Sequence, residues 1–209
     1  MDGLFRRRNR PHLDVPGGMY FVTFCLAGSL PASGAVAIAA QWRARALHPP
    51  PGQTPARWRA TCSAAAFAAT DRLLDSAPAV RWLADRRLAA IVQEALLYRH
   101  GTAYDLLAYV VMPSHCHVVF APLNDEIGSR CSRQSILQSL KRRTAAECNR
   151  LLGRSGTFWQ PESYDRLVRG QVSLDRVVCY VEQNPVKAGL CTTAAAWEFS
   201  SAHTRPRPL

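Results

Sequence analysis

The chain has 209 residues and is 48% hydrophobic, which is enough for one domain with a substantial core. Its 26 Lys and Arg residues against 15 Asp and Glu residues give a net charge of +11. This excess favours a polyanionic partner such as nucleic acid, with a merely soluble basic protein as the alternative. Seven cysteines with no Cys-x-x-Cys pair argue against a disulfide scaffold. Without an apolar signal core or a stretch of about 18 apolar residues, we expect a cytoplasmic protein with no membrane partner.

Residues 1–18 are basic and rich in proline and glycine, which predicts an irregular N-terminal arm. Basic arms often lie along nucleic-acid phosphates, and a disordered tail fits the same composition. The candidate DNA contacts in this arm are Arg6, Arg7, Arg8 and Arg10.

Residues 19–28 give a clear secondary-structure prediction, whereas residues 29–78 do not. Residues 19–28 are dense in aromatic and β-branched side chains, which predicts a strand covered on both faces. Residues 29–78 are rich in Ala, Pro and Arg and read as an insertion. Short helices fit 41–47 and 64–74, with a proline-rich loop between them and no motif.

The stretch "VVMPSHCHVVF" at 110–120 lies at the centre of the pattern. An amphipathic helix is predicted over 79–101, and a strand over 104–111 leads into this stretch. Because side chains alternate along a strand, His115 and His117 share one face. Two adjacent imidazoles can hold one metal ion, and a pair of ordinary hydrogen-bonded histidines is the alternative.

The remaining elements complete a recognisable order. A helix is predicted over 132–153, a strand ending near Arg169, and a helix over 173–190 that Pro185 interrupts at Asn184. Strand, helix, strand, strand, helix, strand is the split βαβ, ferredoxin-like α+β pattern, with a mainly antiparallel sheet and helices on one face. The last helix is an addition. We expect a single domain over 19–202 and a tail over 203–209.

Two polar residues stand out on the last helix. At about 100° per residue, Tyr180 and Asn184 fall together one turn apart, on the flank of the buried stripe. A tyrosine hydroxyl and an amide oxygen presented together suggest a nucleophile and a metal ligand. The two histidines of the strand would complete such a site.

These motifs also carry a resemblance. "YVVMPSHCHVVF", "FWQPESYDRLVR" and "YVEQNPVKAGL", in that order, closely resemble the REP-associated tyrosine transposases of the HUH class of single-strand DNA endonucleases. The similarity runs from about Tyr20 to Ala202 and includes "FVTFCLAGSLP", "LKRRTAAECNRLLG" and "WEFSSA". Ser114 departs from the asparagine that commonly precedes the first histidine, and Cys116 is an unusual central residue.

The resemblance implies a function and a set of roles. His115 and His117 would bind a divalent metal, Mg²⁺ or Mn²⁺, with Asn184 as the third ligand and Tyr180 as the nucleophile. The enzyme would cut and rejoin single-stranded DNA beside a hairpin through a 5′-phosphotyrosine, without a nucleotide cofactor, and a monomer is favoured over a homodimer. The alternative is a catalytically silent, domesticated hairpin-DNA-binding protein.

Other residues compete for these roles. Tyr104, Tyr109 and Tyr164 are the rival tyrosines, but none has an amide partner one turn away. Trp159 fits either stacking on unpaired bases or the core. Besides the arm, the predicted DNA contacts are Lys141, Arg142, Arg143 and Lys187.

Overall fold

The computed structural model describes residues 17–30, 32–76, 78–123, 131–161 and 163–204. The N-terminal arm with Arg6, Arg7, Arg8 and Arg10 therefore lies outside the described residues, as does most of the predicted tail.

The described chain builds one antiparallel sheet of four strands in the order β2-β3-β1-β4. The strands are β1 (Met19–Cys25), β2 (Tyr104–Val111), β3 (His115–Pro122) and β4 (Tyr164–Val168). β1 and β3 form the central pair, with Thr23 opposite His117. This strand order confirms the predicted ferredoxin-like α+β fold.

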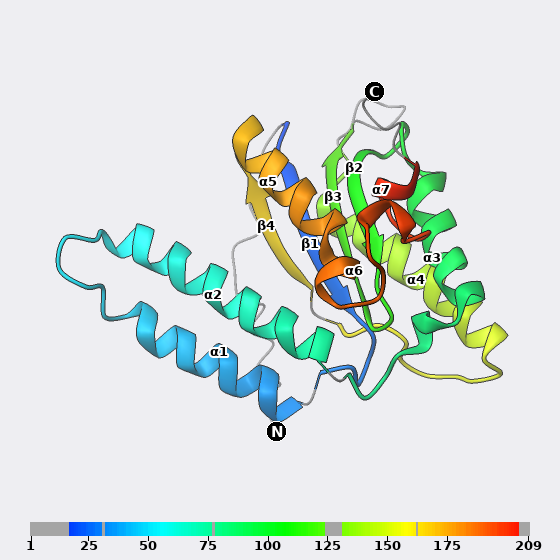
Figure 1. Cartoon of the computed structure of the whole chain (residues 1–209), viewed down its shortest axis with the longest axis horizontal. Coiled ribbons are helices and arrows are strands. Elements are labelled where there is room, and N and C mark those ends of the chain that lie inside the picture. Colours follow the sequence, from blue (N-terminus) through cyan, green and yellow to red (C-terminus); the bar gives the residue numbers. More distant parts are fainter. Residues whose placement is uncertain (1–16, 31, 77, 124–130, 162, 205–209) are drawn as a thin grey trace, which may run out of the picture.

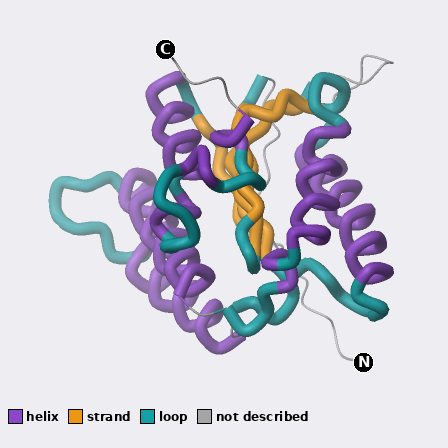
Figure 2. Tube along the Cα trace, turned by 45° about the vertical axis from the view of Figure 1, so that its right-hand side comes forward, coloured by secondary structure: helices purple, strands orange, loops and turns teal. Residues whose placement is uncertain are grey.

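Two helices cover one face of the sheet, α3 (Arg86–Tyr98) and α4 (Arg133–Leu151). Figure 2 shows the sheet almost edge-on, with these helices on one side of it. The side chains of Asp85 and Ser132 cap the two helices by accepting backbone N–H bonds at 2.9 and 3.0 Å. The apolar stripes then pack on the even-numbered side chains of β1 and β3; this core includes Val22, Phe24, Leu88, Val92, Cys116, Val118, Phe120, Ile136 and Leu140.

The opposite face carries α5 (Gln171–Glu182), α6 (Asn184–Lys187) and α7 (Ser201–Thr204). Val177 and Val181 of α5 pack in a second apolar cluster with Phe21 and Val119 of the sheet. α5 ends two residues earlier than the proline predicted, and Asn184 begins the short α6. Pro185 fits there because the first turn of a helix needs no N–H from that residue.

Residues 29–78 form more structure than the sequence indicated. Two long helices, α1 (Ala32–Ala46) and α2 (Pro55–Ser76), lie side by side and extend away from the sheet (Figure 1). Alanine-rich segments have high helix propensity, which the neighbouring prolines obscure in the sequence pattern. Pro55 occupies the first turn of α2, where proline is favoured.

The hairpin is fixed at both ends. Near its tip, the Trp58 indole donates a hydrogen bond of 2.8 Å to the Arg45 carbonyl. Near the sheet, the Phe67 ring lies 5.3 Å from that of Phe21 and 6.0 Å from that of Tyr180, measured between centroids. The C-terminal half of α2 is therefore packed on the same face of the sheet as α5. No helix in the described part of the chain is long and apolar enough to cross a membrane.

Candidate active site

The two histidines of β3 lie buried on the α5 face of the sheet, with His115 1% exposed and His117 0%. Their Nε2 atoms are 3.1 Å apart. Each Nδ1 is engaged by a hydroxyl, that of Ser114 at 2.9 Å for His115 and that of Thr23 at 2.7 Å for His117. These outer contacts orient the rings so that both Nε2 atoms point at one place, as metal-binding histidines require.

Ser114 stands where the resembled transposase motif commonly has asparagine, and its hydroxyl supplies contacts of its own. Its Oγ lies within hydrogen-bonding distance of the Leu74 carbonyl, at 3.4 Å, as well as of His115. Burial, together with the positive charge of His117, lowers the pKa of His115 to about 3. His115 is therefore a neutral imidazole at physiological pH, which is the form that binds metals.

A carboxylate that the sequence analysis missed completes this cluster. Asp71 of α2 places Oδ1 3.1 Å from His117 Nε2. Asp71, His115 and His117 each offer one ligand atom, and the three atoms lie within 4.8 Å of one another. Burial alone would raise the pKa of Asp71, but hydrogen bonds and positive charge from His117, with a hydrogen bond from Tyr180, lower it to about 2. The carboxylate is therefore ionised.

Tyr180 of α5 reaches the same cluster, because its hydroxyl donates a hydrogen bond to Asp71 Oδ2. Its ring centroid lies 5.8 Å from that of His117, and Lys187 Nζ lies 4.4 Å from the Tyr180 centroid. Burial and the negative charge of Asp71 raise the pKa of Tyr180 far above its usual value. In this arrangement Tyr180 is a phenol, and a cation is needed to favour its ionised form.

Asn184 is fully buried at the start of α6. Within the described residues, neither its Oδ1 nor its Nδ2 has a hydrogen-bond partner of normal geometry. Its amide lies close enough to the Tyr180 hydroxyl to act against the rise in that pKa. A buried amide without partners costs about 1–3 kcal/mol, so an acceptor left free here is suited to a ligand or metal.

The donor set fits a divalent cation. Without a cation, a proton between His117 Nε2 and Asp71 Oδ1 joins these two groups. A bound cation would take the place of that proton, with each Nδ1 still paired to its hydroxyl and both Nε2 lone pairs facing Asp71 Oδ1. Three electron-rich atoms around one point repel one another unless a positive charge lies among them. The buried His-His-Asp group is thus consistent with the metal site of an HUH protein.

The rival tyrosines lie elsewhere. Tyr104 donates to the Leu96 carbonyl at 2.7 Å and Tyr109 accepts from Gln93 at 2.9 Å, so both face α3 on the other side of the sheet. Tyr164 on β4 is 37% exposed, and its ring centroid lies 6.5 Å from that of Phe67. Of the tyrosines in the described part, only Tyr180 reaches Asp71 and the histidines.

The predicted DNA-contacting residues are divided between the two faces. Lys187 lies beside Tyr180, whereas Lys141, Arg142 and Arg143 lie on α4 across the sheet. The Lys141 ammonium donates to the Gln160 carbonyl at 2.8 Å. Trp159 is buried and donates to the Thr144 hydroxyl at 2.8 Å, so it belongs to the core.

The fold and site define a ferredoxin-like α+β domain with a buried His-x-His strand, a carboxylate and a tyrosine. No family model matches the chain. Two curated relatives do: a putative REP-associated tyrosine transposase of Haemophilus influenzae and the REP-associated tyrosine transposase of Escherichia coli K12. The first is 28% identical over 107 residues, covering 48% of this chain and 60% of the relative. The second is 25% identical over 129 residues, covering 58% and 72%.

The match thus spans less than two thirds of the first relative's length. A solved structure of a REP-associated tyrosine transposase bound to a REP hairpin shares the fold, with a TM-score of 0.58 at 16% identity. The likeness covers 93% of this chain and 82% of that one. The resemblance indicated by the sequence motifs is confirmed: this chain has homologues among the REP-associated tyrosine transposases.

Proposed function

We propose that this protein is a metal-dependent single-strand DNA endonuclease and strand transferase that cuts and rejoins DNA beside hairpin repeats. One observation carries the proposal: three separate elements bring Tyr180, Asp71 and the paired histidines together in one buried cluster. A nucleophile next to a set of metal ligands is what phosphoryl transfer requires. The names of the curated relatives support the same reaction class.

His115 and His117 would hold the metal through Nε2, with oxygen ligands from Asp71 and Asn184. This assignment keeps Asn184 as a ligand and adds Asp71. Nitrogen ligands suit Mn²⁺, and Mg²⁺ is a second candidate because oxygen ligands suit it. When bound, the cation would neutralise charge on the scissile phosphate and favour the ionised form of Tyr180.

The residues of the chain supply the remaining parts of the reaction. The Tyr180 oxygen forms a bond to phosphorus while the bond from phosphorus to the 3′ oxygen breaks. The Tyr180 proton passes to Asp71 Oδ2, which already accepts its hydrogen bond. Through a water molecule, Asp71 passes this proton on to the departing 3′ oxygen, which becomes a free hydroxyl, and the carboxylate is restored. The 3′ hydroxyl of a second strand then attacks the phosphotyrosine by the same steps in reverse, which joins the two strands and frees Tyr180. No nucleotide cofactor is consumed.

Adduct formation tests this proposal. The protein is incubated with Mn²⁺ and a DNA hairpin that carries a single-stranded flank, and the covalent adduct is resolved on a denaturing gel. Wild type and the matched control Tyr164→Phe should form the adduct, whereas Tyr180→Phe and wild type with EDTA should not. An adduct with Tyr180→Phe at wild-type level would contradict the assignment. Binding without any adduct across several metals and hairpins would favour the silent DNA-binding protein.

A further inference from the structure

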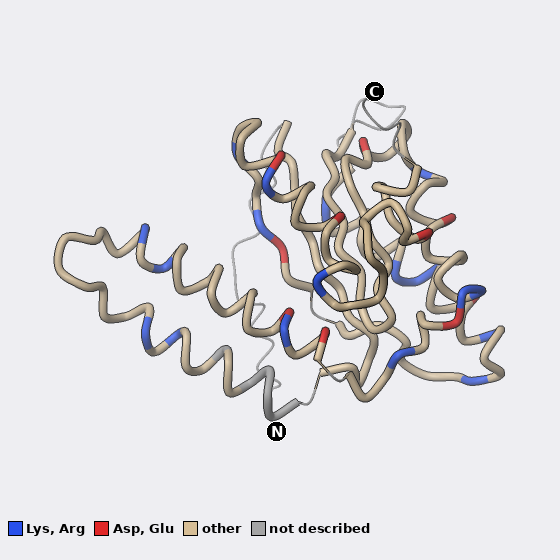
Figure 3. The backbone as a smooth tube through the Cα atoms, in the orientation of Figure 1, with Lys and Arg blue, Asp and Glu red and all other residues tan. Residues whose placement is uncertain are grey.

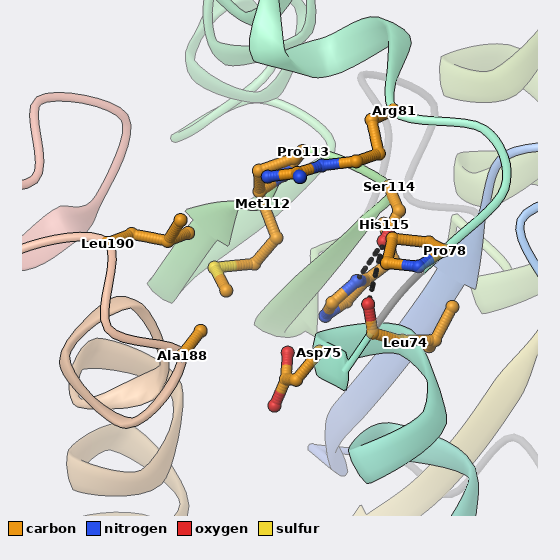
Figure 4. Close-up of a pocket in the computed structure, with 10 residues that line it drawn as sticks. All are labelled: Leu74, Asp75, Pro78, Arg81, Met112, Pro113, Ser114, His115, Ala188 and Leu190. Atoms are coloured by element: carbon orange, nitrogen blue, oxygen red, sulfur yellow. Dashed lines mark hydrogen bonds between the residues drawn. The ribbon is translucent and has the colours of Figure 1, made fainter.

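A pocket of about 160 Å³ opens beside His115 (Figure 4). His115 also belongs to the cluster that holds Asp71, His117 and Tyr180. Its walls come from the C-terminal end of α2, the turn between β2 and β3, and the segment that follows α6. The proposed reaction gives this space no role. Because His115 is shared by the pocket and the metal cluster, a group bound here would lie next to the reacting phosphate.

The size of the pocket limits what it can hold. At about 30 Å³ per water, the space equals roughly five water molecules. Pockets for drug-sized ligands are roughly 300–1,000 Å³, so this one suits a single planar ring system. The apolar part of its lining comes from Leu74, Met112 and Leu190.

One polar group faces this apolar surface. Asp75, one helical turn after Asp71 on α2, has an Oδ1 that is buried without a hydrogen-bond partner in the described structure. Burial and the nearby charge of Asp71 raise the pKa of Asp75 to about 6. A carboxylate in this position repels a phosphate and is stabilised by N–H donors. A nucleobase offers those donors on its edge, together with flat apolar faces.

Arg81 lies at the rim of the same pocket. It is exposed, and its guanidinium lies over Pro113 at the entrance (Figure 4). A cation at the mouth and a carboxylate inside match the two ends of a nucleotide whose base enters the pocket and whose phosphate stays at the surface.

We propose that this pocket binds one unpaired base next to the scissile phosphate, with Asp75 accepting from its N–H edge and Arg81 contacting an adjacent phosphate. The inference rests on the proposed function, because the strand reaches this pocket when its phosphate is at the metal cluster. Guanine is the expected base, since its N1–H and N2–H groups form two adjacent donors for one carboxylate. Adenine and cytosine place an acceptor beside their amino group, and thymine offers a single ring N–H between two carbonyls.

Cleavage kinetics test the proposal. Oligonucleotides carrying each of the four bases at each nucleotide flanking the cut are compared for kcat/KM of adduct formation. In wild type, kcat/KM should be about tenfold higher with guanine at one flanking position, which is the discrimination that one good bidentate contact provides. Asp75→Asn, which presents a donor beside an acceptor, should lose that preference and gain relative activity on adenine or cytosine. The charge-matched control is Asp105→Asn, an exposed residue at the far end of β2 from Met112, and it should keep the preference.

A second variant separates the pocket from the stability of α2. Ala188→Leu fills the pocket from the α6 side while leaving Asp75 in place, and it should abolish base preference with a wild-type melting temperature. Equal rates for all four bases at both flanking positions of wild type, or an unchanged preference in Asp75→Asn, would overturn the proposal.

A separate binding experiment distinguishes a protein that does not cleave DNA from one whose pocket does not bind a base. If wild type forms no adduct, a fluorescent guanine analogue that keeps the N1–H and N2–H donors is placed at successive positions of the single-stranded flank, and its fluorescence is measured on binding with EDTA. A change at one position that Ala188→Leu removes would retain the pocket without the reaction. No change at any position would reject the pocket.

Discussion

A single carboxylate, that of Asp71, contacts both the imidazole of His117 and the hydroxyl of Tyr180. The two histidines, Tyr180 and Asn184 are recognisable from sequence because each pair is local: two residues apart on a strand, or one turn apart on a helix. Asp71 cannot be recognised in this way, because its partners His117 and Tyr180 are 46 or more positions away in the sequence and its own helix carries no motif. The only signal is that Asp71 is the first acidic residue after Asp14.

The depressed pKa of Asp71 makes stability depend on pH in a defined direction. Its folded-state pKa of about 2 lies below the ordinary 3.8, so its contribution is present above pH 4 and is lost as the pH falls towards 2. The shift corresponds to about 2 kcal/mol. In urea unfolding with EDTA, wild type should exceed Asp71→Asn by about this amount at pH 5, and the gap should close between pH 4 and pH 2. A gap that is constant with pH would show that Asp71 makes no charge-dependent contact.

Metal binding offers a second test of the same residue. If Asp71 is a ligand, Asp71→Asn should bind Mn²⁺ at least tenfold more weakly by calorimetry, because an anionic oxygen is lost. Asp105→Asn, which makes the same charge change far along β2, should bind as wild type does. Equal affinities for the two variants would remove Asp71 from the ligand set.

At the level of elements, α2 decides whether the site is complete. β3 and α5 could be predicted from their periodicity: β3 lies inside the sheet, and α5 packs on the face of the sheet that carries the two histidines. The long α1–α2 hairpin could not, because alanine gives no face to an amphipathic pattern and prolines interrupt the segment. That hairpin nevertheless delivers Asp71 to the site and Asp75 to the adjacent pocket.

The docking of α2 depends on Phe67, whose ring contacts those of Phe21, His117 and Tyr180. Phe67→Ala should lower the free energy of unfolding by about 2 kcal/mol, less than the 3–5 kcal/mol of a fully buried Phe because this ring is half-buried. It should also slow adduct formation more than it weakens DNA binding, because Asp71 loses its placement. Val172→Ala, at a side chain that is 66% exposed on α5, is the control and should change neither. An unchanged cleavage rate in Phe67→Ala would show that α2 does not position the site.

At the scale of the molecule, positive charge is spread unevenly over the two faces. Figure 3 shows Lys and Arg, without Asp or Glu, along the outer half of the α1–α2 hairpin. No acidic residue occurs between Asp14 and Asp71, and the basic residues at the tip are Arg43, Arg45, Arg57 and Arg59. The hairpin is docked on the α5 face, the face of Tyr180 and Lys187, whereas Arg142 and Arg143 of α4 lie across the sheet.

We therefore expect single-stranded DNA to contact the hairpin more than α4. Each phosphate contact contributes about 0.7 to the slope of log K against log salt for single strands. Replacing Arg57 and Arg59 by Ala should lower that slope by about 1.4, whereas the same change at Arg142 and Arg143 should have a smaller effect. Fluorescence anisotropy over a range of NaCl concentrations measures both. A larger effect from the α4 pair would instead support the predicted DNA contacts of Arg142 and Arg143.

The most direct measurement is the identity of the residue that becomes joined to DNA. A hairpin oligonucleotide labelled at its 3′ end is incubated with the protein and Mn²⁺, the adduct is digested, and the nucleotide-bearing peptide is sequenced by mass spectrometry. The proposed reaction predicts a single modified residue, Tyr180, joined to the 5′ phosphate of the labelled fragment, while a 5′-labelled strand leaves with a free 3′ hydroxyl. Attachment at another residue, or attachment of the 5′-labelled fragment, would contradict it.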